Sequence, residues 1–128
     1  MYEIIKYKTE NGRCLIDEFL DELIEDRSNF KLVTKIEQYI NMLSAYGYQI
    51  NQLFNPKASK RVDDENGIYE LRPDDVRVFY YFISEDQSYV LLHGFVKKKN
   101  KAEEEIKKAI REKKDYDRRY KGGKQSIK

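Results

Sequence analysis

Cysteine and histidine are scarce in this sequence, and their scarcity excludes several kinds of site. The single cysteine, Cys14, excludes an internal disulfide and a cysteine-based zinc finger. The single histidine, His93, argues against a metal centre built from histidines, so we expect neither a metal ion nor another cofactor. No apolar run approaches the ~18 residues of a membrane span, and the first residues lack the apolar stretch of a signal peptide. We therefore expect a soluble, cytoplasmic protein that does not bind a membrane.

The length and charge pattern indicate one domain with a basic C-terminal end. A chain of 128 residues that is 40% hydrophobic and 13% aromatic can form one compact core, although 38% of its residues are charged. Residues 91–128 carry 14 basic and 6 acidic side chains, a net charge of +8, whereas residues 61–90 have a net charge of −5. A basic patch attracts phosphates, although a lysine-rich end is also often only a solvated surface.

Hydrophobic periodicity predicts an α+β fold with a helix hairpin lying on one face of a sheet. Ser28 is the expected N-cap of the second helix of the hairpin, and Gly47 its expected C-cap. The predicted elements are a strand at 2–8, a helix at 16–24, a helix between Ser28 and Gly47, an irregular connection at 49–67, an antiparallel meander of strands at 68–72, 76–83 and 89–96, and a helix at 102–116. We assign residues 1–118 to the domain and 119–128 to a basic flexible tail.

Two arginines stand at the first turn of the predicted meander. Arg77 interrupts an otherwise nearly apolar strand, and Arg72 ends the preceding strand, across the hairpin. Guanidinium groups bind phosphate oxygens through two parallel hydrogen bonds, so two of them near a sheet face suit a phosphate. The alternative is that each arginine only pairs with Glu70, Asp74 or Asp75 at the edge of the sheet.

His93 and a lysine cluster mark the last predicted strand. Histidine is the side chain best suited to move protons near neutral pH, although a lone histidine in a strand is more often structural. Lys97, Lys98 and Lys99 follow where the strand leads into the last helix, a common place for anion sites. Tyr80 and Tyr81 are neighbours on one strand and point to opposite faces, so we expect one of them to be available for function.

Several segments together resemble the HigB-type toxins of the RelE/ParE superfamily of bacterial toxin–antitoxin systems, in their phage-derived HigB-like branch. The resemblance extends from residue 2 to about residue 116. The segments that carry it are Gly67-Ile68-Tyr69-Glu70-Leu71-Arg72, Arg77-Val78-Phe79-Tyr80, Leu91-Leu92-His93-Gly94-Phe95 and Lys97-Lys98.

The resemblance implies a small α+β ribonuclease that enters the ribosomal A site, cuts the translated mRNA without a metal ion and so inhibits translation. The 2′-hydroxyl of the RNA attacks the adjacent phosphate, and by resemblance Arg72 and Arg77 stabilise the charge that develops there. The resemblance likewise implies that Lys97 and Lys98 contact the phosphate or protonate the leaving oxygen. Arginine is too basic to take the 2′-hydroxyl proton, so His93, Tyr80 or a lysine is left for that role. The residues expected to bind RNA elsewhere are Lys60, Arg61, Lys99 and Lys101.

The resemblance also implies a protein partner and leaves two alternative functions. The partner is a helix-turn-helix antitoxin similar to HigA, which neutralises the toxin. One alternative is a toxin of the ParE kind, which poisons DNA gyrase and cuts no RNA. The other is an inactive phage-derived binding module that keeps only the fold.

Overall fold

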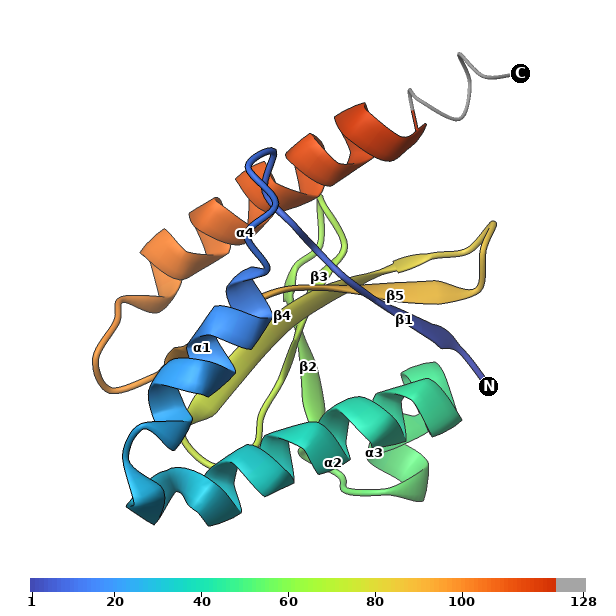
Figure 1. The fold of residues 1–128 in the computed structure, drawn as a ribbon. Helices are drawn as coiled ribbons and strands as arrows, with labels where there is room; N and C mark the ends of the chain where they lie inside the picture. The colour runs from blue at the N-terminus through green and yellow to red at the C-terminus, as the bar shows by residue number, and fades with distance from the viewer. Residues whose placement is uncertain (122–128) are drawn as a thin grey trace.

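The computed structural model describes residues 1–121, which form a five-stranded sheet with helices on both faces (Figure 1). The strands are β1 (Glu3–Lys6), β2 (Ser59–Asp63), β3 (Ile68–Leu71), β4 (Val76–Ile83) and β5 (Ser88–Val96). The helices are α1 (Leu15–Ile24), α2 (Phe30–Tyr46), the single turn α3 (Ile50–Leu53) and α4 (Ala102–Tyr116). The order of strands in the sheet is β1-β5-β4-β3-β2, and the α+β class predicted from the sequence is confirmed.

β5 is bordered by a strand along its first half and by a helix along its second half. β1 runs parallel to β5, with Glu3 opposite Ser88 and Lys6 opposite Leu91. Farther along, α1 packs beside β5, and the ring of Phe19 lies only 2.7 Å from where a Cβ atom of Gly94 would be. The missing side chain of Gly94 therefore lets α1 approach the sheet closely.

Two hydrophobic cores cover the two faces of the sheet, and they explain why one prediction about the tyrosines is wrong. α1 and α2 pack on the face that carries Tyr80, and α4 packs on the face that carries Tyr81. Tyr80 is 3% exposed and Tyr81 is 2% exposed, so both are core residues. The expectation that one of them is available assumed a sheet with one solvated face, whereas helices cover both faces here.

Local structure differs from the sequence prediction at two places. The connection at 49–67 contains α3 and the edge strand β2, whose sequence Ser-Lys-Arg-Val-Asp lacks the apolar alternation that signals a strand. Ser28 is not the cap of α2, because the carboxylate of Asp26 caps a 3₁₀ turn at Arg27–Asn29 and α2 begins only after it. Gly47 does cap the C-terminus of α2, with φ +56°, as predicted.

The chain stays helical beyond α4, in a π-helical turn at Asp117–Lys121. This turn includes the first three residues of the tail predicted for 119–128, and the rest of that predicted tail lies outside the described residues. None of the helices within residues 1–121 has the length and apolar character needed to span a membrane.

Candidate active site

A cluster of charged side chains gathers on the α4 face of the sheet, at the turn between β3 and β4. Ile68 at the start of β3 belongs to the core under α4, and the alternation of the strand turns Glu70 and Arg72 to the same side. Arg77 lies on this face of β4 as well, because it is two residues from the buried Phe79 of the same core. The meander therefore brings the two predicted arginines together, with Glu70 between them.

Glu70 forms ion pairs with both arginines, as the alternative interpretation of the sequence expected. Its Oε2 atom lies 3.4 Å from Nε of Arg72 and 3.5 Å from Nε of Arg77. Both distances exceed the 2.7–2.9 Å of a charge-assisted hydrogen bond. The Nε atom of Arg72 is buried and donates no hydrogen bond. The carboxylate is thus held by charge, not by a tight two-point hydrogen bond.

The two arginines differ in how far their guanidinium groups are already engaged. Arg77 is buried, and its Nη1 donates to the carbonyl oxygens of Asp74 at 2.9 Å and of Val76 at 2.8 Å. These bonds tie its guanidinium to the turn that connects β3 with β4. The side chain of Arg72 is 30% exposed and has no such backbone bonds, so it is the more accessible of the two.

Burial outweighs the nearby charges in the electrostatic environment of Glu70. Burial raises the pKa of this carboxyl above its usual value, and the nearby positive charges of Arg77, Arg72, Lys60 and Lys97 lower it only in part. Lys60 lies opposite Glu70 in the β2–β3 pair and is exposed. The cluster is therefore one buried carboxylate surrounded by four cations.

The predicted lysines line the exit from β5. The backbone N–H of Lys97 donates to the carbonyl of Asp75 at 2.8 Å, which fixes the lysine segment beside the β3–β4 turn. Lys97, Lys98, Lys99 and Lys101 are all exposed, and Lys101 is the residue before α4. Of these, Lys97 has a charge that lowers the pKa of Glu70.

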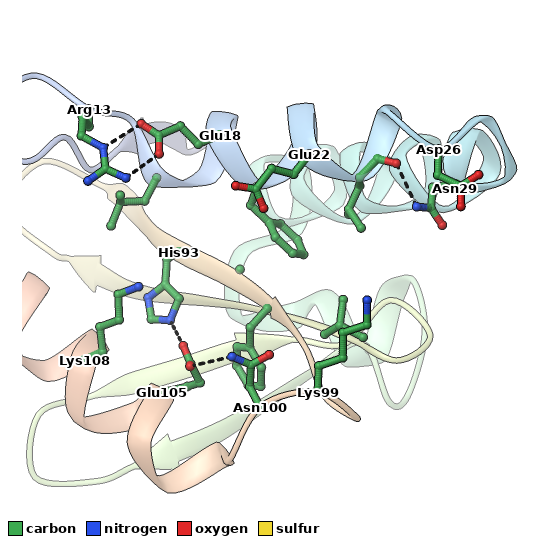
Figure 2. A pocket seen from close by; sticks show the side chains of 16 residues that line it. Arg13, Glu18, Glu22, Asp26, Asn29, His93, Lys99, Asn100, Glu105 and Lys108 are labelled. Carbon is green, nitrogen blue, oxygen red and sulfur yellow. Dashed lines mark hydrogen bonds and ion pairs between the residues drawn. The ribbon is translucent and has the colours of Figure 1, made fainter.

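His93 lies elsewhere, in a buried contact between β5 and α4. A bulge in β5 opposite Phe79 turns His93 toward the helix, where its Nδ1 lies 2.7 Å from Glu112 and its Nε2 lies 2.8 Å from Glu105. Figure 2 shows His93 and Glu105 facing one another at the wall of a cavity of about 540 Å³, with Asn100 bonded to the same glutamate. Both ring nitrogens are occupied by carboxylates, so the structure joins His93 to α4 and not to the arginines.

Tyr80 and Arg61 lie on the opposite face of the sheet from the arginine cluster. The hydroxyl of Tyr80 is 2.5 Å from that of Ser59, and burial raises the pKa of Tyr80 far above its usual value. Arg61 lies over the ring of Tyr69 and pairs with Asp64 at 3.2 Å. Tyr80 and Arg61 both line a separate cavity of about 380 Å³.

The sequence analysis missed three acidic residues as parts of these sites. The sequence analysis considered Glu70 only as an ion-pair partner of the arginines. An acidic residue at an inward-facing strand position is unusual, and this by itself indicates a possible functional site. Glu105 and Glu112 are seven residues apart, which places them on one face of α4, and the acidic character of that face was the available signal. Within residues 1–121 no three histidine, cysteine or carboxylate side chains are arranged to hold a metal ion.

Comparison with known proteins agrees with this architecture. Residues 22–114 match the family described as "Phage derived protein Gp49-like (DUF891)", a range that contains the whole arginine cluster. A solved structure of an archaeal RelE–RelB complex from Pyrococcus horikoshii OT3 has a similar fold, with a TM-score of 0.51 at 14% identity, over 77% of this chain and 98% of that chain. No curated protein sequence matches the chain. The match over most of the length shows that the chain belongs to the phage-derived Gp49-like family, a family of RelE/ParE-type toxins.

Proposed function

We propose that the chain is the HigB-type toxin of a toxin–antitoxin pair and that it cuts mRNA on the ribosome. The observation that carries this proposal is the cluster of Arg72, Arg77 and Lys97 around one carboxylate on the α4 face. Membership in a RelE/ParE-type family supports the toxin function, and the cluster supports a reaction at a phosphate.

The cluster suits attack by a 2′-hydroxyl on the neighbouring phosphate. That reaction passes through a phosphorane with extra negative charge, which cations fixed in advance stabilise. Arg72 is accessible and would contact the phosphate oxygens, while Arg77 is fixed to the backbone of the turn and would hold the cluster in place. Lys97, or its neighbour Lys98, would protonate the leaving 5′-oxygen, giving a 2′,3′-cyclic phosphate and a 5′-hydroxyl.

An arginine cluster can bind any phosphate, so it does not by itself position an RNA chain. The lysines around the cluster would position the chain. Lys60 borders the cluster on β2, and Lys98, Lys99 and Lys101 continue from Lys97 toward α4. This exposed basic rim would contact phosphates on either side of the cut. Arg61 lies on the other face of the sheet, and its contribution would be separate from this path.

An antitoxin partner is part of the proposal. The similar solved structure from Pyrococcus horikoshii is a complex of RelE with RelB, which supports a protein partner for this fold. We propose a helix-turn-helix partner of the HigA kind and an action in the cytoplasm, where ribosomes are.

The test is primer extension on a defined mRNA incubated with the protein, with and without translating ribosomes. The informative variants are Arg72→Ala and Arg72→Lys, because Arg77 also holds the turn. Arg27→Ala, at an exposed site between α1 and α2, is the control. New 5′ ends that require ribosomes, disappear in Arg72→Ala and persist in Arg27→Ala would support the proposal.

Other outcomes of the same experiment point to other functions. Cleavage of free RNA would keep the nuclease and remove the ribosome as an obligatory partner. No cleavage by the wild-type protein under either condition would overturn the proposal. A gyrase-dependent DNA cleavage assay would then separate a toxin of the ParE kind from an inactive binding module.

A further inference from the structure

We infer that Glu70 is the general base that takes the proton from the attacking 2′-hydroxyl. This inference rests on the function proposed above and assigns the role that the sequence left open between His93, Tyr80 and a lysine.

The position of Glu70 is fixed by the sheet. Its backbone lies in β3 between two paired strands, opposite Lys60 on β2 and Phe79 on β4. Its side chain is 12% exposed, so the carboxylate is largely shielded from water yet still reachable from the surface. A base held on an interior strand of the sheet keeps its place relative to Arg72 and Arg77, and this precision is what proton transfer requires.

The contacts of Glu70 leave its carboxylate able to accept a proton. Its distances of 3.4 Å and 3.5 Å to Arg72 and Arg77 are those of loose ion pairs. Nη1 of Arg77 donates its hydrogen bonds to two backbone carbonyls, and Nε of Arg72 donates no hydrogen bond. An RNA whose phosphate binds Arg72 would therefore bring the adjacent 2′-hydroxyl next to the carboxylate of Glu70. The oxygens of this carboxylate can still accept further hydrogen bonds.

The electrostatic surroundings of Glu70 make its carboxylate a stronger base than an exposed glutamate. Four charged groups face it: Lys60 from β2, Arg72 after β3, Arg77 from β4 and Lys97 after β5. Burial nevertheless raises the pKa of Glu70 above its usual value, because the loss of hydration outweighs the attraction of these cations. A carboxylate with a raised pKa binds a proton more strongly in the transition state than an ordinary surface carboxylate.

The other candidates are less suited by their placement. Both nitrogens of His93 are bonded to Glu105 and Glu112, so His93 would have to break a buried pair before taking a proton. Tyr80 lies on the opposite face of the sheet, bonded to Ser59. Lys97 is exposed after the end of β5, where its ammonium group is placed to give a proton to a leaving oxygen at the surface.

The proposed step balances in protons and electrons. The 2′-oxygen gives its proton to a carboxylate oxygen of Glu70 and forms a bond to phosphorus. The bond between phosphorus and the 5′-oxygen breaks, and that oxygen takes a proton from the ammonium group of Lys97. The products are a 2′,3′-cyclic phosphate and a 5′-hydroxyl, and Glu70 and Lys97 regain their starting states by exchanging protons with water.

The test compares Glu70→Gln with Lys97→Ala under single-turnover conditions on ribosome-bound mRNA. Two substrates are used, one normal and one with sulfur in place of the leaving 5′-oxygen. A sulfur leaving group needs no acid, so it restores the rate of a variant that lacks the acid but not of one that lacks the base. We expect Glu70→Gln to slow cleavage of both substrates by about 100-fold or more, and Lys97→Ala to slow only the oxygen substrate.

The pH profile supplies a second readout that a structural role would not change. In the wild-type protein the rate falls at acidic pH as Glu70 becomes protonated, and in Glu70→Gln the remaining rate lacks this fall. Glu70→Asp should keep the acidic fall with a lower rate, because it retains a carboxylate at a shorter reach. Glu65→Gln, an exposed position in the β2–β3 turn, is the matched control and should match the wild type.

Failure of this inference can be distinguished from failure of the proposed function. If the wild type cuts mRNA while Glu70→Gln cuts within a few-fold of it, Glu70 is not the base and the nuclease remains. Rescue of Glu70→Gln by the sulfur substrate would also overturn the assignment. If the wild type cuts no RNA, the proposed function falls and this inference falls with it. Matching thermal unfolding midpoints of the wild type and Glu70→Gln establish that a lost rate is not lost folding.

Discussion

At the scale of single residues, the buried charged side chains within residues 1–121 occur in two groups, one around Glu70 and one around His93. Glu70 lies between two arginines, and His93 lies between Glu105 and Glu112. Each ring nitrogen of His93 shares a proton with one glutamate. This arrangement requires either an imidazolium between two carboxylates, or a neutral ring with one carboxylate and one protonated carboxyl. Removing one member of such a group leaves a buried polar partner without compensation.

The His93 contact predicts a strong coupling with Glu112. His93→Ala should lower the free energy of unfolding by about 3–5 kcal/mol, because it leaves Glu112, which is 6% exposed, as an uncompensated buried carboxylate. The double variant His93→Ala/Glu112→Ala should lose less than the sum of the two single losses, with a coupling of at least about 1 kcal/mol. Urea denaturation of the four proteins measures this coupling, and additive losses would show that the pair is not a unit.

At the scale of elements, the C-terminal end of α4 is tied to the segment after β1. Asp115 accepts a hydrogen bond of 2.6 Å from the hydroxyl of Tyr7 and bonds of 2.6 Å and 2.7 Å from Arg118 and Arg119. Arg119 also donates to the carbonyl oxygen of Lys8. This network lowers the pKa of Asp115 to about 2, mainly through the hydrogen bonds from Arg119 and Tyr7.

Asp115 should therefore contribute to stability at neutral pH and lose that contribution in acid. The pKa of Asp115 is about 2 in the folded protein and 3.8 in the unfolded chain, so the unfolded chain binds more protons between these values. The contribution is complete above pH 3.8 and disappears as the pH falls through about 2. Asp115→Asn should lower the free energy of unfolding at pH 7 by about 1–2 kcal/mol, allowing for solvent screening.

The measurement for Asp115 is urea denaturation of wild type and variant at several pH values. The difference between the two proteins should shrink from pH 4 toward pH 2. Asp64→Asn is the control, because its side chain is 85% exposed in its pair with Arg61 and should contribute little. A difference that is constant over this pH range would contradict the assigned network.

The junction after α2 depends on a glycine. Gly47 has φ +56°, and a Cβ atom there would overlap the ring of Tyr2 and lie 2.9 Å from the hydroxyl of Tyr89. Gly47→Ala should destabilise the fold by about 2–4 kcal/mol, the sum of a left-handed backbone and overpacking. Gly12→Ala is the control, because Gly12 also has a positive φ but no atom within 4 Å of the added Cβ, so about 1 kcal/mol is expected. Equal losses in thermal or urea unfolding would show that the packing against Tyr2 is unimportant.

At the scale of the whole molecule, the C-terminal part of the chain carries the excess of positive charge. Residues 91–128 have a net charge of +8, and four lysines between β5 and α4 are exposed, of which Lys97 lies beside the arginine cluster. Each phosphate contact releases about 0.7 counterion from a single-stranded RNA, so these lysines should set the salt dependence of binding.

The double variant Lys98→Ala/Lys99→Ala should weaken binding of a single-stranded RNA oligonucleotide and flatten its salt dependence. The slope of log affinity against log salt should decrease in magnitude by about 1–1.5, equally for different sequences. Arg27→Ala/Lys31→Ala removes the same charge from the exposed region where α1 meets α2 and should leave the slope unchanged. Fluorescence anisotropy at four salt concentrations tests this, and equal slopes in all three proteins would exclude the lysine segment from the path.

The sequence alone determined the α+β class, because helix and strand periodicities are local patterns. The stripe from Ile16 to Ile24, the nearly apolar run Val76–Ile83 and the cap Gly47 each depend on residues a few positions apart. The same local pattern placed Arg72 and Arg77 across one hairpin, and a tight turn leaves few other arrangements.

Only the tertiary structure decided the partners of these residues. β2 forms because β3 offers it a free edge, and Tyr80 and Tyr81 are both buried because helices distant in sequence cover both faces of the sheet. His93 is 19 residues from Glu112, and no periodicity links a bulged strand to one face of a later helix. Burial raises the pKa of Glu70 and so contributes to its suitability as a base. It is a property of the packed molecule, because it depends on which chain segments exclude water from the carboxylate.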